Sequence, residues 1–205
     1  FTSAKEEEKK EKEEDMATGF GFNAPAVNIS KEVGSHRIRW DLRHAGRTTK
    51  SGRKIPGPMV APGQYSIKFK FDDQAIMTPF NVVTDPRIDI ADEDLQEQEK
   101  LLLDIMKLQT EADVLNSQIN KKIKSFAEGS VVPDNIKTLH KALNTAEGRY
   151  QTPMLVDQLR YLFSMLNRAD QRPGKDAFDR FKDLHASLEK LRLDAKRTGI
   201  EWQVD

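Results

Sequence analysis

The sequence lacks cysteine altogether, so neither a disulfide nor a thiolate metal site can form. This absence suits an oxidising envelope or extracellular space without requiring one. No apolar run approaches the roughly 20 residues that a membrane-spanning helix needs. Basic and acidic residues balance at 33 each, so the whole chain carries no net charge that would attract nucleic acid or anionic lipid. We therefore expect no nucleic-acid partner and no direct membrane span.

The patterns of residues that carry catalysis are also missing. The chain has only four histidines, and none lies four residues from another, as two zinc ligands on one helix would. No glycine-rich phosphate loop precedes an expected helix, and no serine or threonine occupies a nucleophile elbow. We expect no catalytic residue, no metal site and no cofactor in this chain.

The charge that is present is distributed unevenly. Residues 1–19 carry four lysines against seven acids, and residues 5–15 contain no apolar side chain, which predicts a solvated linker or loop. Residues 20–84 carry ten basic against four acidic residues, a net charge of +6. The chain begins at Phe1 without a signal-peptide pattern, and we expect it to be part of a longer polypeptide.

Alternating apolar residues between Gly34 and Arg87 predict antiparallel strands with one dry face. The alternation runs through residues 38–43, 65–71 and 75–83, and we interpret residues 20–87 as a small Ig-like β-sandwich. Pro62 and Gly63 mark a turn before the second strand, and Pro86 ends the β-sandwich because proline cannot extend the ladder. The residues expected to hold the sandwich together are Trp40, Pro62, Gly63, Tyr65 and Pro86. Trp40 and Tyr65 would alternatively line a sugar site if they were exposed.

A polar stretch between the first two strands forms an expected basic loop. It offers a contact surface for an acidic partner, an anionic glycan or a phosphate, and a simple solvated loop is the alternative. No aromatic residue is interleaved to stack on bases. The basic-loop residues are Arg43, Arg47, Lys50, Arg53 and Lys54.

The period of the apolar residues changes to that of helices after residue 87. The first helix is expected to be capped at its N-terminus by Asp92 and to end at Gly129, with a single apolar stripe from Leu101 to Phe126. Three shorter helices follow, over about residues 133–148, 152–173 and 177–199, each bounded by proline or glycine. Short loops favour antiparallel neighbours, so residues 88–205 are predicted to form an antiparallel up-and-down bundle of four helices. The expected fold class is α+β.

One polar cluster lies beside the apolar stripe of the third helix: Asp157, Gln158, Arg160 and Tyr161. Such a cluster either fixes the register of neighbouring helices or binds a partner helix.

Several short motifs stand out together: Trp40-Asp41-Leu42-Arg43, residues 57–65, Asp85-Pro86-Arg87, residues 152–159 and residues 169–174. They resemble the C-terminal region of bacterial sortilin-like BNR-repeat proteins, large β-propellers often labelled glycosyl hydrolase or exo-sialidase-like. In that family an Ig-like module and then a helical tail follow the propeller. The similarity covers about residues 34–205. The propeller repeats are absent from this chain, and residues 1–33 offer no strand pair for a first hairpin of the module.

The resemblance implies a secreted, periplasmic or cell-surface bacterial protein. We expect this chain to be a non-catalytic docking or scaffolding region that contacts the upstream propeller of its own polypeptide or other envelope proteins. One alternative is an accessory region that completes a glycan- or peptide-processing site on the propeller. Another is a glycan-binding module.

Overall fold

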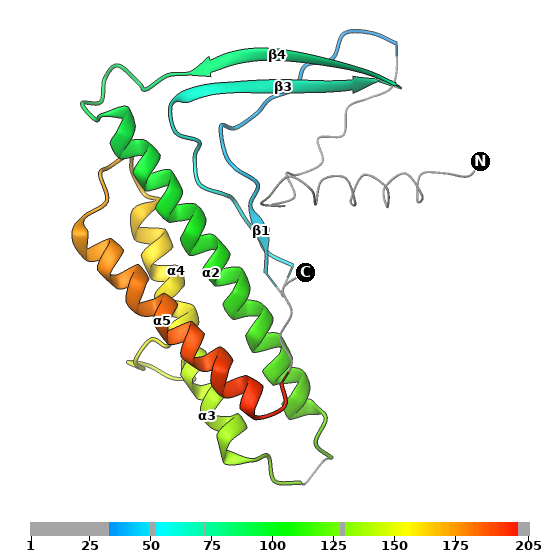
Figure 1. Ribbon diagram of the computed structural model, residues 1–205, viewed down its shortest axis with the longest axis vertical. Coiled ribbons are helices and arrows are strands. Elements are labelled where there is room, and N and C mark those ends of the chain that lie inside the picture. Colours follow the sequence, from blue (N-terminus) through cyan, green and yellow to red (C-terminus); the bar gives the residue numbers. More distant parts are fainter. Residues whose placement is uncertain (1–32, 50–51, 72, 128–129, 201–205) are drawn as a thin grey trace. The chain divides into compact units, whose positions relative to one another are not determined.

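A computed structural model describes residues 33–49, 52–71, 73–127 and 130–200 (Figure 1). The chain divides into two compact units, Phe1–Met59 and Val60–Asp205. The described residues form four helices and two antiparallel two-stranded sheets, which confirms a mixed α+β protein. The expected linker over residues 1–19 lies outside the described residues, and the expected domain limits at residues 20, 87 and 88 stay predictions.

The first unit contains a small hairpin where a loop was expected. Strand β1, Arg47–Thr48, pairs antiparallel with β2, Lys54–Ile55. Outside these two strands, Arg43 forms an isolated antiparallel bridge with Met59. The backbone comes together so closely here that a Cβ on Gly46 would lie 2.0 Å from the carbonyl oxygen of Ile55. This close approach explains the glycine at position 46.

The strand predicted over residues 38–43 is wrong. No strand forms there, and the three alternating apolar side chains Ile38, Trp40 and Leu42 are 51%, 42% and 38% exposed. Alternation produces a buried face only where a second layer covers it. Among the described residues only Arg43 of this segment pairs, in its isolated bridge with Met59, and the expected burial of Trp40 is not met. Its indole N–H instead donates to the carbonyl of Arg43 at 3.0 Å.

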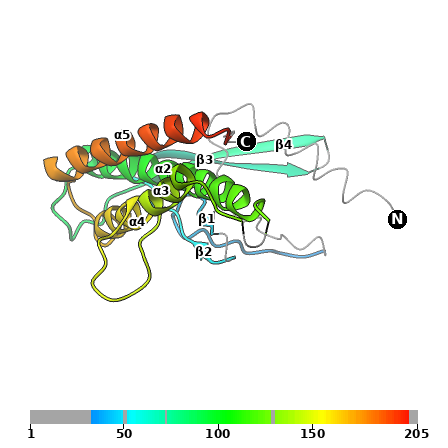
Figure 2. The same cartoon turned by 90° about the horizontal axis from the view of Figure 1, so that it is seen from below.

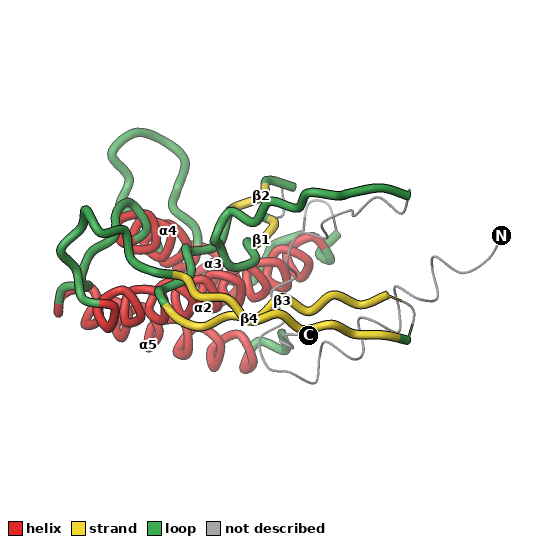
Figure 3. The backbone as a smooth tube through the Cα atoms, turned by 90° about the horizontal axis from the view of Figure 1, so that it is seen from above, coloured by secondary structure: helices red, strands yellow, loops and turns green. Residues whose placement is uncertain are grey.

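The second unit begins with a long hairpin, which confirms the two strands expected after the Pro62-Gly63 turn. Strand β3, Gly63–Phe71, pairs antiparallel with β4, Gln74–Val82, through nine residue pairs. The last pair of this ladder is Phe71 with Gln74. Figure 3 shows the two strands side by side along their whole length. The two sheets among the described residues have two strands each, and the expected Ig-like sandwich stays a prediction.

The four predicted helices are confirmed, although their ends differ from the expected ones. Helix α2 is Asp92–Lys124, α3 is Asp134–Leu143, α4 is Leu155–Leu166 and α5 is Lys175–Arg197. The N-cap of α2 is Ala91 rather than Asp92, whose carboxylate accepts a hydrogen bond from Thr84. Helix α3 stops five residues before Gly148, since Asn144 already has an extended backbone. None of the described helices meets the length and hydropathy that crossing a membrane requires.

The helices bury the stripes that the sequence predicts. Helix α2 alone contributes eleven buried residues, and α3, α4 and α5 add apolar residues at helical spacing. Burial of this kind is the main source of stability for amphipathic helices. The side chains below 2% exposure include Ile105, Met106, Leu115, Ile119, Leu143, Leu159 and Leu188.

The helices run in three courses rather than in simple up-and-down alternation (Figures 1 and 2). Helix α4 returns along the first half of α2, where Gln109 donates to the carbonyl of Leu159 at 3.0 Å. Helix α3 returns along the second half, where Asn116 and Asn144 exchange hydrogen bonds of 2.7 and 3.0 Å. Helices α3 and α4 therefore share one course, and α5 follows α2 in the same direction. The reason is length: α2 spans about 50 Å, which neither α3 nor α4 can cover alone.

The buried amide of Gln98 ties α2 to the chain between α4 and α5. Gln98 is only 6% exposed, and its Nε2 donates to the carbonyls of Leu166 at 2.7 Å and Ala169 at 2.8 Å. Its Oε1 accepts from the backbone N–H of Gln171 at 3.3 Å. A buried amide with all of these partners fixes the register of the two helices, because an unpaired buried amide is costly.

Two leucines on α5 provide a matched test of this core. Leu188 is 0% exposed and Leu193 is 61% exposed. We expect Leu188→Ala to lower the free energy of unfolding by about 2–5 kcal/mol, because it removes buried methyl groups and leaves a cavity. Leu193→Ala should change it by no more than about 0.5 kcal/mol. Urea unfolding followed by circular dichroism measures both, and equal effects would contradict the assignment of the buried face.

Candidate functional site

The structure separates the residues of the predicted basic loop. Arg43 is half-buried and donates to the carbonyl of Gly57 at 3.0 Å, which gives it a structural role. Arg47 is also half-buried, whereas Arg53 and Lys54 are exposed. Lys50 lies outside the described residues. The loop is a hairpin closed by Thr49, whose backbone N–H donates to the carbonyl of Arg53 at 2.9 Å. The described part of the loop thus offers two exposed cations rather than a continuous basic surface.

The β3–β4 hairpin exposes an apolar row that the sequence placed in a core. Ile67 and Phe69 of β3 and Ile76 of β4 are 60%, 45% and 61% exposed. They share one side of the hairpin, because Phe69 pairs with Ile76 and Ile67 lies two residues along the same strand. Met77, on the other side, is 63% exposed. A row of large apolar side chains at this exposure is typical of a surface that another protein covers.

The base of this hairpin is anchored to α2. Glu99 accepts a hydrogen bond from the backbone N–H of Ala61 at 3.1 Å, and Gln96 donates to the carbonyl of Pro62 at 3.3 Å. The hydroxyl of Tyr65 donates to the carbonyl of Ala61 at 2.8 Å, and its ring lies 6.0 Å from that of Phe80. Pro62 is buried, and Gly63 begins β3. The structural roles expected for Pro62, Gly63 and Tyr65 stay predictions.

The pKa of Tyr65 reflects this position. Partial burial raises the pKa of its phenol above the ordinary value, and the negative charge of Glu99 raises it further. Tyr65 is therefore neutral at physiological pH and available to donate the hydrogen bond that closes the base of the hairpin.

Beyond β4, Pro86 is exposed in a turn between Asp85 and Arg87. The guanidinium of Arg87 bonds the carboxylate of Asp85 at 2.5 to 3.1 Å. This contact lowers the pKa of Asp85 and raises that of Arg87. The pair is solvent-exposed, so we assign it to the shape of the turn that leads into α2.

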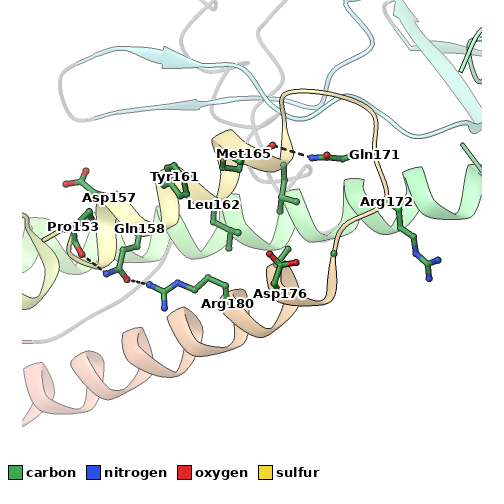
Figure 4. A pocket seen from close by; sticks show the side chains of 13 residues that line it. Pro153, Asp157, Gln158, Tyr161, Leu162, Met165, Gln171, Arg172, Asp176 and Arg180 are labelled. Atoms are coloured by element: carbon green, nitrogen blue, oxygen red, sulfur yellow. Dashed lines mark hydrogen bonds between the residues drawn. The ribbon is translucent and has the colours of Figure 1, made fainter. Parts of the chain in front are cut away.

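A groove of 810 Å³ lies between α4 and α5 (Figure 4). Tyr161 and Met165 of α4 line it and are 68% and 40% exposed, and Leu162 forms part of its floor. Arg172 and Arg180 line its margin together with Asp157 and Asp176. The groove is apolar at its base and has both charge signs at its edge, so its charge does not select one class of ligand.

The polar cluster of α4 contacts neighbouring segments, which agrees with the first of its two predicted roles, fixing the register of the helices. Gln158 accepts from the guanidinium of Arg180 on α5 at 2.7 Å (Figure 4). Asp157 accepts a hydrogen bond from Thr145 at 2.5 Å, and this bond links α4 to the segment after α3. It also accepts from Arg160, one turn along α4, at 3.1 Å. Tyr161 remains exposed in the groove, so the alternative role, binding of a partner helix, is still open for that residue.

Within the described ranges, no group of three or more histidine, aspartate or glutamate side chains is arranged to hold a metal ion. The surfaces that stand out are thus the apolar hairpin and the α4–α5 groove, and both are suited to binding. The alternation of apolar residues identifies this row, but it predicts burial in a core. The sequence offers few further strands that could cover the row, and a two-stranded hairpin cannot cover its own apolar face.

The anchor at Tyr65 gives a test of this geometry. We expect Tyr65→Phe to lower the free energy of unfolding by about 1 kcal/mol, because the hydrogen bond to Ala61 is lost. The stability that neutral Tyr65 contributes is complete below the ordinary tyrosine pKa and is lost as pH rises through the raised folded-state pKa.

Glu99→Gln should therefore bring the pKa of Tyr65 down towards the ordinary value, as ultraviolet titration of the phenols measures. Tyr161→Phe, at an exposed position, is the control for the stability measurement. A Tyr65 pKa that does not change in Glu99→Gln would show that Glu99 does not act on the phenol.

Comparisons with protein-family models, with curated proteins and with solved structures found no match.

Proposed function

We propose that this chain is a non-catalytic docking region whose β3–β4 hairpin is the contact element and whose helices are its support. The observation that carries the proposal is the exposed apolar row of Ile67, Phe69 and Ile76 on a hairpin anchored to α2. Helices that bury most of their apolar stripes beside a hairpin whose apolar row is exposed are typical of a support that presents a binding surface.

The proposal includes the setting that the sequence resemblance implies. The chain would be the C-terminal region of a secreted, periplasmic or surface-exposed bacterial β-propeller protein of the BNR-repeat type. It would dock on that propeller or on another envelope protein. The hairpin would then be part of an Ig-like sandwich completed by strands from outside the described residues. Supporting observations are the exposed sheet face and the motifs that resemble those of that family.

Site-specific photo-cross-linking in the native cells tests the proposal. A photoreactive amino acid at Ile67 is compared with the same amino acid at Leu193, because the two positions are 60% and 61% exposed but lie on the hairpin and on α5. We expect Ile67 to cross-link to a defined peptide of the propeller or of an envelope protein, and Leu193 to give none. Mass spectrometry identifies the peptides.

Two results would contradict the docking proposal. One is an equal background of products from both positions, which would mean that the apolar row has no dedicated partner. The other is cross-linking of Ile67 only to residues within these 205, which would mean that the row is covered internally.

A second candidate is glycan binding, either as a separate module or as part of a site on the propeller. The 42% exposure of Trp40 favours it, because sugar sites use exposed aromatic rings. Isothermal titration with sialyllactose tests it. Trp40→Ala should abolish the heat of binding, whereas Leu42→Ala, at a neighbouring position of 38% exposure, should preserve it. An absence of binding by the unmodified chain, or equal binding by Trp40→Ala, would exclude this role.

A further inference from the structure

The hairpin is an incomplete sheet within the described residues. Strand β3 pairs only with β4, and the two form a two-stranded sheet of nine residue pairs. A two-stranded hairpin is marginally stable in water, and a third strand or a covering layer normally completes it. The two free edges are therefore the places where a further strand would add.

The outer edge of β4 is blocked by Pro79. Proline has no N–H, so it is tolerated on an edge strand only where its nitrogen faces away from the partner strand. Pro79 pairs with Ser66, and this pair is accordingly one of those without mutual backbone hydrogen bonds. The missing donor then lies on the outer edge of β4, which is a common protection against strand addition.

The outer edge of β3 has no such protection. Hydrogen-bonded and non-hydrogen-bonded pairs alternate along an antiparallel ladder. Every second residue of β3, counted from Ser66, therefore directs its backbone N–H and carbonyl away from β4. These residues are Gln64, Ser66, Lys68 and Lys70. None of them is a proline, and each has a backbone N–H and carbonyl that the pairing with β4 does not use. A new strand would find a complete set of partners there.

The two faces of β3 specify the strand that would fit. On one face Ile67 and Phe69 are 60% and 45% exposed. On the other face Lys68 and Lys70 lie opposite Met77 and Ala75 of β4, so neither lysine has a carboxylate directly across the ladder. A neighbouring strand would gain most from apolar side chains on the first face and carboxylates on the second.

We propose that the outer edge of β3 binds an extended segment of a partner protein in which apolar residues alternate with aspartate or glutamate. The segment adds as a third strand. Its backbone bonds the outward groups of Ser66 and Lys68, its apolar side chains extend the row of Ile67 and Phe69, and its carboxylates meet Lys68 and Lys70. This inference rests on the proposed docking function and names the kind of partner and the mode of binding.

A second copy of this chain is a poorer occupant of the same edge. Its β3 would present Gln64, Ser66, Lys68 and Lys70 on the charged face, with no carboxylate among them. Pairing two such strands gathers four lysines on one face of the sheet, and like charges across a ladder are destabilising. The charge of the edge therefore favours an acidic partner over self-association.

Fluorescence anisotropy with synthetic heptapeptides tests the inference on the full chain. The first peptide alternates valine with glutamate, and a matched peptide alternates valine with lysine. We expect the glutamate peptide to bind about tenfold more tightly than the lysine peptide, because two cross-strand pairs change from attraction to repulsion. In the variant Lys68→Glu/Lys70→Glu this preference should be reversed.

The backbone contribution is tested by a matched pair of proline variants. Ser66→Pro removes an outward N–H and retains both lysines and the β4 ladder, so it should weaken binding of the glutamate peptide about tenfold with an unchanged circular dichroism spectrum. Ile67→Pro removes a donor to β4 and should instead destabilise the hairpin itself.

Several outcomes would overturn the inference. They are the absence of peptide binding at millimolar concentration, equal binding of the two peptides, and no effect of charge reversal. Dimerisation of the unmodified chain in analytical ultracentrifugation that Ser66→Pro abolishes would assign the edge to a second copy. If Ile67 still cross-links to a partner in cells while the peptides fail, docking stands and strand addition falls. If both fail, the docking function falls as well.

Discussion

The length of α2 is the constraint on which the rest of the second unit depends. Its stripe is buried from Leu95 to Ile119, and no other helix is long enough to cover it alone. Two short helices therefore share one return course, and α5 runs alongside. The seam is held in register by buried amides, because Gln98 and Gln109 satisfy their hydrogen-bonding groups only when α4 lies in one position along α2. The first turns of α2 also bond the chain that enters β3, so the hairpin inherits its anchor from the same helix.

This arrangement divides the work between two kinds of structure. The helices bury most of their apolar side chains among themselves, whereas the hairpin extends from α2 with its apolar row exposed and its β3 edge without a proline. The position of Pro79 decides which edge can accept a further strand, because it removes a backbone donor from the outer edge of β4 and none from β3. Lysines on the opposite face of β3 then add a preference for acidic partners. Binding then depends on the missing third strand and covering layer of the sheet, and the helices provide the stability that a two-stranded sheet does not.

The helical half was predictable from sequence, and the β half only in part. Long stripes such as Leu101 to Ile119 carry the helical period over many turns, and proline or glycine marks the ends of the helices. Period-2 alternation identified β3 and β4 equally well. It did not say whether a second layer covers the dry side, so Ile67 and Phe69 were assigned to a core that the described residues do not form. The same limit applies to Trp40, whose alternating neighbours form no strand. Pairing between distant segments, as between Gln98 and Leu166, has no local signature at all.

Hydrogen exchange at single residues in β3, followed by nuclear magnetic resonance, tests whether the helices stabilise a hairpin whose β3 edge is unpaired. The amides of Ile67 and Phe69, which face β4, should then exchange much more slowly than those of Ser66 and Lys68, which face outward. An alternating pattern of this kind is the predicted result. Equal protection at all four amides would show that the β3 edge is already occupied within this chain, and would contradict the account.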